Sequence, residues 1–383
     1  MLIDLTVTAD EHVVTSMTVP TKLGTRLQGA ALLCTARHSS FAGLISKWLL
    51  LTLTLFVAPN LMAADLASSA LYEIKGRIAA PDALWDYAAV DSGIRRLYVG
   101  RIGGVMAVDL DSQSVIPVLV SSALVHGVVP IRDTGLVAST NGEGNTVSIF
   151  EGKTGHLVAT IPAGKEPDAI ALEPKSGLLV VANAESADLT LIDVNRRAAV
   201  GQIAVGGKPE FLAANGEGLV YNNLANRNEV AVIDISARKI IRKLKLPGCQ
   251  EPTGLAYDAS DSLVISVCQN GVVKFINAKT YHEAATFTVG KGPDAVIFDA
   301  ARHTAFVPSG DDGTLTVFAV NSANDIRVQQ KLRTQLGTRT GALDPTTGVL
   351  YFPSAQLAPP TKPGSWPSVV PGTFAVLVVS PAR

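Results

Sequence analysis

The sequence predicts an all-β fold, a seven-bladed β-propeller, and three observations lead to that prediction. Hydrophobic residues make up 47% of the 383 residues, and charged residues make up only 17%. The chain also has 33 glycines and 21 prolines, a composition typical of short strands separated by turns. Finally, one short motif recurs seven times at a spacing of 41 to 46 residues, which is the period of propeller blades.

The segment before the first repeat has the pattern of a secretory signal peptide over residues 45–64. Lys47 precedes an apolar run at 48–58, and small residues lead up to Asp65, as expected for cleavage after Ala64. The run is too short to cross a bilayer, which takes roughly 20 apolar residues. We therefore expect an extraneous leader or an incorrect start at 1–44 and a propeller at 65–383. The mature chain is expected in the periplasm or outside the cell, without a transmembrane anchor.

The repeated motif is an anchor residue followed by a short apolar run. The anchors are Trp85, His126, Pro167, Pro209, Pro252, Pro293 and Arg339. Each repeat then continues with a turn and three more strands, as in 178–182, 189–193 and 199–205. Such short runs, rich in Val, Ile and Thr, are typical of strands rather than helices.

The last repeat lacks a fourth strand of its own, because the sequence ends soon after the run at 373–379. The alternating run at 71–78, which precedes the first anchor, can take that place. Pairing the N-terminal strand of the mature chain with the last blade would close the ring and cover a sheet edge.

The second and third strands of the repeats carry a recognisable motif. Val180–Asn183 is followed by Leu189–Asp193, and Ala138–Asn141 is followed by Thr146–Phe150. This pattern resembles the YVTN-type β-propeller repeat family, which includes the YncE-like exported proteins. The resemblance covers all seven repeats. It implies an architecture rather than a chemistry, since most members of the family have no defined activity.

Two cysteines remain once the leader is removed, Cys249 and Cys268. In an exported protein an even number of cysteines predicts a disulfide. Cys249 precedes the first strand of its blade and Cys268 ends the antiparallel second strand, so both thiols fall at the same end of the blade. The bridge would close a loop of about 20 residues and contribute roughly 3 kcal/mol. The alternative is two separate buried thiols.

The anchors of a propeller gather around one mouth of its central channel, so the residues at and beside them are candidates for ligand binding. The candidate set is Trp85, Asp86, His126, Asp168, Glu210, Asp294, Arg339 and Trp366. His126 and Arg339 occupy the anchor slot itself, and the four carboxylates follow anchors. The alternative role for each carboxylate is to accept hydrogen bonds from backbone N–H groups and fix a turn.

Trp366 belongs to a proline-rich insertion at 353–371, which enlarges the loop between the second and third strands of the last blade. Long loops in compact domains often carry function. Trp366 is expected either to close over the channel mouth or to pack against a blade edge.

These features predict an exported binding or scaffold protein that presents its channel mouth to a small ligand or a periplasmic protein partner. No catalytic residues and no cofactor are predicted, with a divalent cation such as calcium as the alternative. A second hypothesis is a lactonase-like hydrolase that uses the carboxylates, His126 and Arg339. A third is single-stranded nucleic-acid binding by the basic run at 238–245. It ranks last, because the net charge is −1 and few aromatic residues accompany the run.

Overall fold

The computed structural model describes residues 71–360, 362 and 366–382. The chain divides into two compact units, 1–65 and 66–383, and the described residues all belong to the second. The predictions of a leader and a signal peptide therefore lie outside the described residues. Within the described ranges, no helix has the length and hydrophobicity that crossing a membrane requires.

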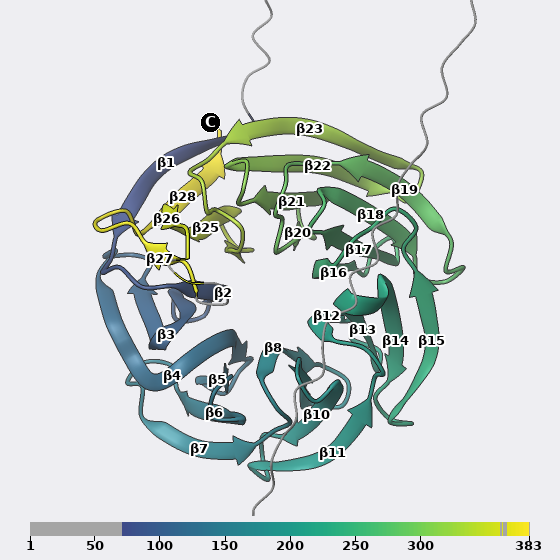
Figure 1. Ribbon diagram of the computed structural model, residues 1–383, viewed down its shortest axis with the longest axis horizontal. Helices are drawn as coiled ribbons and strands as arrows, with labels where there is room; N and C mark the ends of the chain where they lie inside the picture. The colour runs from purple at the N-terminus through teal and green to yellow at the C-terminus, as the bar shows by residue number, and fades with distance from the viewer. Residues whose placement is uncertain (1–70, 361, 363–365, 383) are drawn as a thin grey trace, which may run out of the picture. The chain divides into compact units, whose positions relative to one another are not determined.

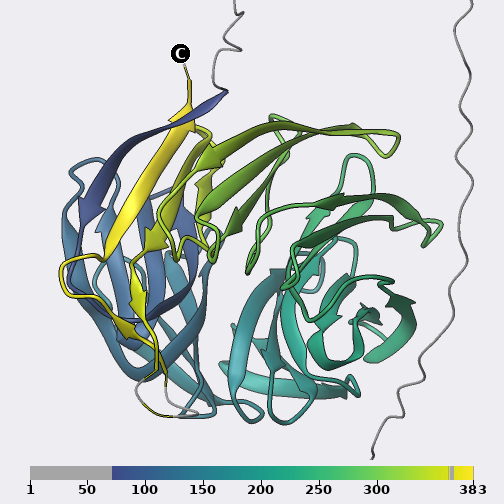
Figure 2. The ribbon, with the colours of Figure 1, turned by 45° about the horizontal axis from the view of Figure 1, so that its top comes forward.

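The described residues form a β-propeller, as the sequence predicted. Antiparallel sheets stand around a ring (Figure 1). The strands of each sheet twist from the centre to the rim (Figure 2), as β-sheets generally do.

Four of the sheets each contain four strands that follow one another in sequence. The first two consist of β8 (Pro167–Glu173), β9 (Leu178–Asn183), β10 (Asp188–Asp193) and β11 (Ala198–Ala204), and of β12 (Pro209–Ala214), β13 (Leu219–Leu224), β14 (Glu229–Asp234) and β15 (Lys239–Lys245). The other two consist of β16 (Pro252–Asp258), β17 (Leu263–Cys268), β18 (Val272–Asn277) and β19 (Glu283–Thr288), and of β20 (Ile297–Asp299), β21 (Thr304–Ser309), β22 (Thr314–Ser322) and β23 (Asp325–Arg333). A short 3₁₀ helix, η1 (Ala225–Arg227), follows β13.

A fifth sheet has six strands, because one long strand takes part in two sets of pairings. Its strands are β2 (Trp85–Asp91), β3 (Arg96–Asp109), β4 (Val115–Ile131), β5 (Leu136–Asn141), β6 (Thr146–Glu151) and β7 (Leu157–Pro162). The first part of β4, through Leu124, pairs with β3. From Val125 onward β4 pairs with β5. The chain therefore passes from an outer to an inner position without leaving extended conformation.

The sixth sheet joins the two ends of the described chain. Its strands are β1 (Tyr72–Ala79), β28 (Ala375–Pro381), β25 (Val349–Ser354) and β24 (Ala342–Asp344), in that spatial order. Strand β1 runs antiparallel to β28, with Tyr72 opposite Pro381 and Ala79 opposite Ala375. Around the ring, strands such as β2, β8, β12, β16 and β20 lie nearest the centre, and β1, β7, β11, β15 and β23 lie at the rim (Figure 1).

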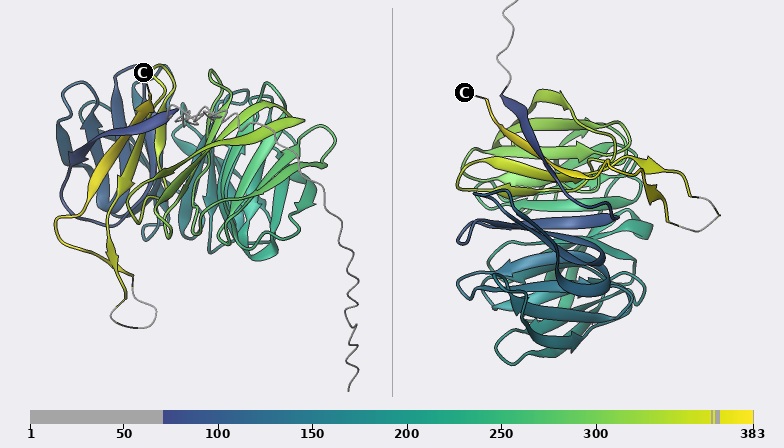
Figure 3. Two further views of the ribbon diagram at one scale, coloured as in Figure 1. Left: turned by 90° about the horizontal axis from the view of Figure 1, so that it is seen from above. Right: turned by 90° about the vertical axis from the view of Figure 1, so that its left-hand side faces the viewer.

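The insertion between β25 and β28 forms a separate two-stranded hairpin, β26 (Leu357–Ala358) and β27 (Ser368–Val369). This hairpin projects from one face of the ring (Figure 3). Its base is held by Asp82, whose carboxylate accepts hydrogen bonds from the backbone N–H groups of Gly372 (2.7 Å) and Phe374 (3.1 Å).

The hydrophobic core lies between neighbouring sheets. All six residues of β17 are buried, whereas β19, the outer strand of the same sheet, has mostly exposed residues. A strand covered on both faces reads as a continuous apolar run, while a strand at the rim is only partly covered. This explains why the second and third strands were the clearest in the sequence.

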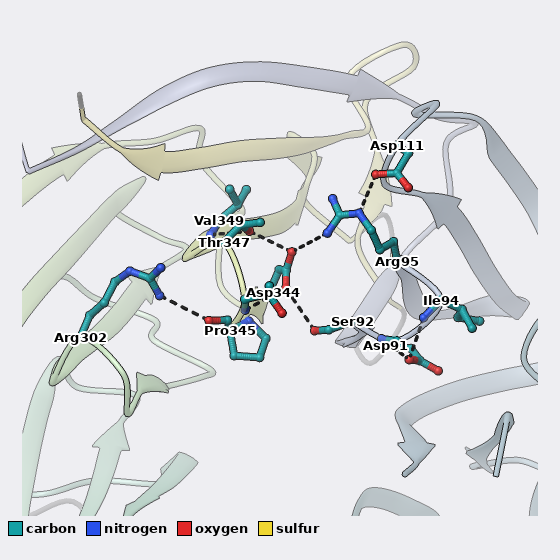
Figure 4. A network of polar contacts seen from close by, with 12 residues as sticks. Asp91, Ser92, Ile94, Arg95, Asp111, Arg302, Asp344, Pro345, Thr347 and Val349 are labelled. Atoms are coloured by element: carbon teal, nitrogen blue, oxygen red, sulfur yellow. Dashed lines mark hydrogen bonds and ion pairs between the residues drawn. The ribbon is translucent and has the colours of Figure 1, made fainter. Parts of the chain in front are cut away.

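The face opposite the hairpin is built from turns that carry buried carboxylates. Asp344 accepts hydrogen bonds from the Thr347 hydroxyl (2.8 Å), the Ser92 hydroxyl (3.1 Å) and the Arg95 guanidinium (3.0 Å) (Figure 4). Arg95 also pairs with Asp111. Because Ser92 and Arg95 follow β2, this network ties the sheet of β1 to the sheet of β2.

The predicted disulfide is present and joins Cys249 to Cys268, with 5.5 Å between their Cα atoms. Cys268 lies opposite Pro252 at the end of the β16–β17 pair. The alternative of two separate thiols is therefore excluded.

Candidate ligand-binding site at the channel mouth

A pocket of about 110 Å³ is lined by residues of β2, β4 and the hairpin and by Arg339, and we refer to the region around it as the mouth. Five of the eight predicted residues line it: Trp85, Asp86, His126, Arg339 and Trp366. The remaining wall is apolar and consists of Leu84, Ile102, Leu124, Val125, Leu357 and Pro367. The other three predicted residues, Asp168, Glu210 and Asp294, belong to the charged cluster described below.

A repeated β-bulge brings the candidate side chains to the mouth. In β2 the pairing register shifts between Trp85 and Ala88, and in β8 it shifts between Pro167 and Ile170. The two residues inside each shift are left out of the ladder. Bulges redirect side chains in this way next to functional sites.

The bulge in β4 corrects the alignment of the repeats. Its register shifts between Val125 and Val128, so Val125, not His126, corresponds to the anchors. His126 instead takes the slot that Asp86 and Asp168 occupy in their strands. The sequence comparison had placed it one position early, because Val125 lacks the ring of the proline or tryptophan that marks other anchors.

His126 lies between two carboxylates. Its Nδ1 is 2.7 Å from Oδ2 of Asp86 and 3.8 Å from Oδ1 of Asp168. Its Nε2 is buried and has no hydrogen-bond partner among the described residues. A Cβ at Gly142 would lie only 2.8 Å from this Nε2, so the glycine provides the space that the imidazole occupies.

Threonine hydroxyls fix the backbone that carries the two carboxylates. The Thr340 hydroxyl donates to the carbonyl of Asp86 (2.7 Å), and the Thr140 hydroxyl donates to the carbonyl of Asp168 (2.6 Å). Both threonines are fully buried. Thr140 lies on β5 and Thr340 just before β24, each in the sheet next to its acceptor, so neighbouring sheets hold each other in place.

Arg339 lies on the opposite side of the pocket and connects Trp85 with Asp294. Its guanidinium donates a hydrogen bond to the carbonyl of Trp85 (2.9 Å), and its Nε is 3.5 Å from Oδ2 of Asp294. The guanidinium carbon also lies 5.7 Å from the centre of the Trp85 ring, within the range of a cation–π contact.

Two aromatic side chains that the sequence analysis missed meet across the interior of the ring. Tyr87 of β2 and Phe211 of β12 meet with their ring centres 4.9 Å apart. Their strands belong to different sheets, so the contact crosses the interior of the ring. One signal could have revealed them: the equivalent position in other inner strands holds small residues, Gly127, Ala169 and Gly254.

The carboxylates of the mouth stabilise the charged imidazole. Burial opposes the charge on His126, but the hydrogen bond to Asp86 and the charges of Asp86 and Asp168 outweigh it and raise its pKa to about 9. An imidazole with this pKa carries a proton at neutral pH.

The same crowding makes the carboxylates hard to ionise. Burial raises the pKa of Asp168 well above its ordinary value, and the nearby charge of Asp86 adds to this. Burial also raises the pKa of Asp294 to about 6, although the Arg339 charge opposes the shift. Glu210 has a raised pKa for the same main reason, although it pairs with Lys208 at 2.8 Å.

The carboxylates of the mouth do not fix turns. Among the described residues, no backbone N–H donates a hydrogen bond to the side chain of Asp86, Asp168, Glu210 or Asp294. The turn-fixing role proposed as an alternative therefore does not describe these four residues. Their contacts within the mouth are with His126, Lys208 and Arg339.

Trp366 reaches the pocket from the projecting hairpin. Its side chain lines the pocket beside Leu357 and Pro367, yet the residue is 64% exposed. Trp366 thus contributes to the wall of this pocket, while most of its side chain faces solvent.

The basic run at 238–245 lies on β15, an outer strand with mostly exposed residues. Arg242 stacks on the ring of Tyr281 at 4.5 Å, and Lys245 pairs with Glu229 at 2.8 Å. Lys243 donates a hydrogen bond to the carbonyl of Val205. Three of its basic residues thus have partners within the protein.

Comparisons with known proteins identify the fold. Hydrazine synthase from Kuenenia stuttgartiensis is similar in structure, with a TM-score of 0.62 and 15% identity over 73% of this chain and 95% of that chain. A chain of the crystal structure of the mitotic checkpoint complex has a TM-score of 0.65 and 17% identity over 79% of this chain and 94% of that chain. No family model and no curated protein sequence matches this chain. At these identities the similarity shows a shared propeller fold and nothing of the function.

Proposed function

We propose that this protein is an exported binding protein that holds a small molecule in the pocket at the channel mouth. The observation that carries the proposal is the pocket itself, where Asp86, His126 and Arg339 are the charged groups in an otherwise mostly apolar wall. Ligand sites typically combine such a wall with a few well-placed polar groups. The ligand would therefore have a small apolar body and one polar end.

The architecture that presents this pocket is, in our proposal, a seven-bladed propeller of the YVTN type. Counting the two parts of β4 separately divides the six-stranded sheet into two blades. The pairing of β1 with β28 then closes the last blade. The disulfide supports export, because disulfides persist mainly in oxidising compartments.

The size of the pocket limits the ligand. An apolar cavity of roughly 150 Å³ holds one benzene molecule, so a pocket of about 110 Å³ suits a single small ring or a short chain. Larger ligands would extend past Trp366 into solvent. A protein partner could insert one side chain into the pocket and make the same contacts. The proposal therefore includes a scaffold role, in which the ligand is part of another protein.

Tryptophan fluorescence tests the proposal directly. The chain has three tryptophans, and Trp85 and Trp366 both line the pocket. In a Trp48→Phe background every tryptophan therefore reports on this site. We expect a screen of small lactones, amines and sugars to yield a compound that changes the fluorescence and raises the Tm by mass action.

Two variants give the test its control. Trp366→Ala should weaken binding of that compound at least tenfold. Leu157→Ala, which shortens another exposed apolar side chain (49% exposed) on the outer strand β7, should change it less than twofold. A compound that binds both variants alike would place its site elsewhere. A screen with no binder would contradict the small-molecule form of the proposal and favour the scaffold role.

A hydrolase is the second candidate, and the hydrogen bond between Asp86 and His126 favours it. A carboxylate that orients a histidine is common in general acid–base catalysis. The His126 pKa of about 9 would make it a proton donor rather than a base at neutral pH. A pH-stat assay can measure lactone hydrolysis by the wild type and the variants. Turnover that falls in both His126→Ala and Arg339→Ala would support this candidate. Turnover that both variants retain would rule it out.

A further inference from the structure

We propose that Asp86, His126 and Asp168 form a binding site for a divalent transition-metal ion such as Zn²⁺ or Mn²⁺. Asp86 and His126 also line the pocket of the proposed ligand site, but Asp168 does not. Variants of Asp168 therefore test the metal site separately from the ligand site.

The spacing of the three side chains is the first argument. The ligand atoms of Asp86, His126 and Asp168 all lie within 4.8 Å of one another. His126 Nδ1 is 2.7 Å from the first carboxylate and 3.8 Å from the second. Zinc binds nitrogen and carboxylate oxygen at roughly 2.0–2.2 Å, which places neighbouring ligand atoms roughly 3–4 Å apart. Only small side-chain movements separate the observed arrangement from that geometry.

The second argument comes from two polar groups beside the carboxylates, the Nε2 of His126 and the phenol of Tyr87. Tyr87 is only 6% exposed, and its phenol lies close enough to Asp86, Asp168, Glu210 and Asp294 to be affected by all four charges. Among the described residues no hydrogen bond reaches its hydroxyl. The buried Nε2 of His126 likewise has no hydrogen-bond partner among the described residues, and a buried polar group without a partner is costly. A bound ion with its water molecules would supply a partner there.

Charge and rigidity also suit a metal ion. Two carboxylates and one neutral imidazole balance the charge of a divalent cation, and metal binding would displace the proton on Nδ1. The Thr340 and Thr140 hydroxyls hold the backbone of Asp86 and Asp168, and Gly142 leaves room for the imidazole of His126. The backbone that carries the two carboxylates is thus held in place before any ion arrives.

The kind of ligand selects the kind of metal. Calcium and magnesium prefer sites made only of oxygen ligands, whereas an imidazole nitrogen suits zinc and other transition metals. This changes the expectation from the sequence, where carboxylates alone suggested calcium. Three protein ligands also leave coordination positions open for water or a bound molecule. Asp86 and His126 line the pocket, so those positions are within reach of it.

Isothermal titration calorimetry on the untagged full chain, freed of metal with a chelator, tests the proposal. We expect one Zn²⁺ or Mn²⁺ ion per chain, bound at least tenfold more tightly than Ca²⁺. His126→Ala and Asp168→Asn should each weaken binding at least tenfold. Zinc binding should also release protons. At a fixed pH, the heat of binding should therefore change between buffers that have different enthalpies of ionisation.

Exposed histidines provide the matched control. His156, His282 and His303 are all exposed, so His156→Ala should change the affinity less than twofold. If His126→Ala does not fold, Asp168→Asn and Asp86→Asn, which keep the shape of the side chain, decide the question. The proposal is overturned if neither metal binds, if Ca²⁺ binds more tightly, or if binding survives in all variants at the three ligands.

Discussion

Strand β8 carries two buried carboxylates, five residues apart, that lie in opposite electrostatic surroundings. Asp168 stands near its start at the channel mouth, and Glu173 ends it on the opposite face. Burial alone would raise the pKa of Glu173, but hydrogen bonds from Ser176, Lys175 and Gly218 lower it. Asp168 receives no such hydrogen bonds within the described residues, and its pKa is raised well above the ordinary value.

The difference separates structural carboxylates from candidate functional ones. Glu173 accepts backbone hydrogen bonds from Lys175 (3.1 Å), Ser176 (2.7 Å) and, in the next sheet, Gly218 (3.1 Å). A carboxylate in that position stabilises the turn and the joint between sheets. The carboxylates of the mouth repel one another instead. Such unfavourable arrangements are concentrated at functional sites.

The largest predicted effect is at the turn. Glu173→Ala removes the acceptor of three backbone N–H groups, and we expect a loss of about 3 kcal/mol in the free energy of unfolding at neutral pH. Because the pKa of Glu173 is lowered by folding, its contribution is present above the pKa of the unfolded chain and disappears as the pH falls through the folded pKa. Urea unfolding measures the loss. If Glu173→Ala lowered the free energy of unfolding by less than Asp168→Asn does, the contrast between Glu173 and Asp168 would be wrong.

Removing the disulfide tests how much it stabilises the end of the sheet that contains β16 and β17. The double variant Cys249→Ser, Cys268→Ser should lower the free energy of unfolding by about 3 kcal/mol, because it frees a loop of about 20 residues in the unfolded chain. The measurement is again urea unfolding, with the wild type in reducing buffer as a second comparison. A loss below about 1 kcal/mol would show that hydrogen bonds suffice at this end.

At the mouth the sign of the effect should reverse. Folding raises the pKa of Asp294 to about 6, so its ionised form is penalised in the folded protein. The penalty is complete above the folded pKa and vanishes as the pH falls below the unfolded value near 4. We expect Asp294→Asn to stabilise the protein by about 2 kcal/mol near pH 8.

The same variant should change little near pH 3.5, where wild-type Asp294 is protonated in both states. Unfolding curves at the two pH values separate the relief of the ionisation penalty on Asp294 from the loss of its contact with Arg339. A destabilised Asp294→Asn protein near pH 8 would mean that the ion pair with Arg339 outweighs the cost of burial.

The smallest effect on stability is expected at the hairpin. Trp366 is 64% exposed, so Trp366→Ala should change the free energy of unfolding by less than about 0.5 kcal/mol. Differential scanning calorimetry measures the change. A larger loss would give Trp366 a structural role and weaken its assignment to the pocket.

Much of this arrangement could be predicted from the sequence, because each repeat places equivalent residues at the same end of an inner strand. The strand boundaries, the disulfide and the gathering of Trp85, Asp86, His126 and Arg339 follow from that period. The contact of Tyr87 with Phe211 could not be predicted in the same way, since it depends on the width of the ring.

Two other features also required the structure. The bulge in β4 moves His126 by one position relative to the repeat alignment, and a bulge leaves no clear mark in an apolar run. The contrast between Asp168 and Glu173 depends on which backbone N–H groups point toward each carboxylate. Residue type alone does not determine that.

The most direct test of the contrast between mouth and turn is a carboxyl-carbon NMR titration of metal-free protein. Asp294→Asn and Glu173→Gln would assign the two signals. We predict that Asp294 titrates near pH 6 and that Glu173 titrates below the usual range of glutamate. If Asp294 instead titrated at or below pH 4, the mouth carboxylates would be as well compensated as those of the turns, and the central claim would be wrong.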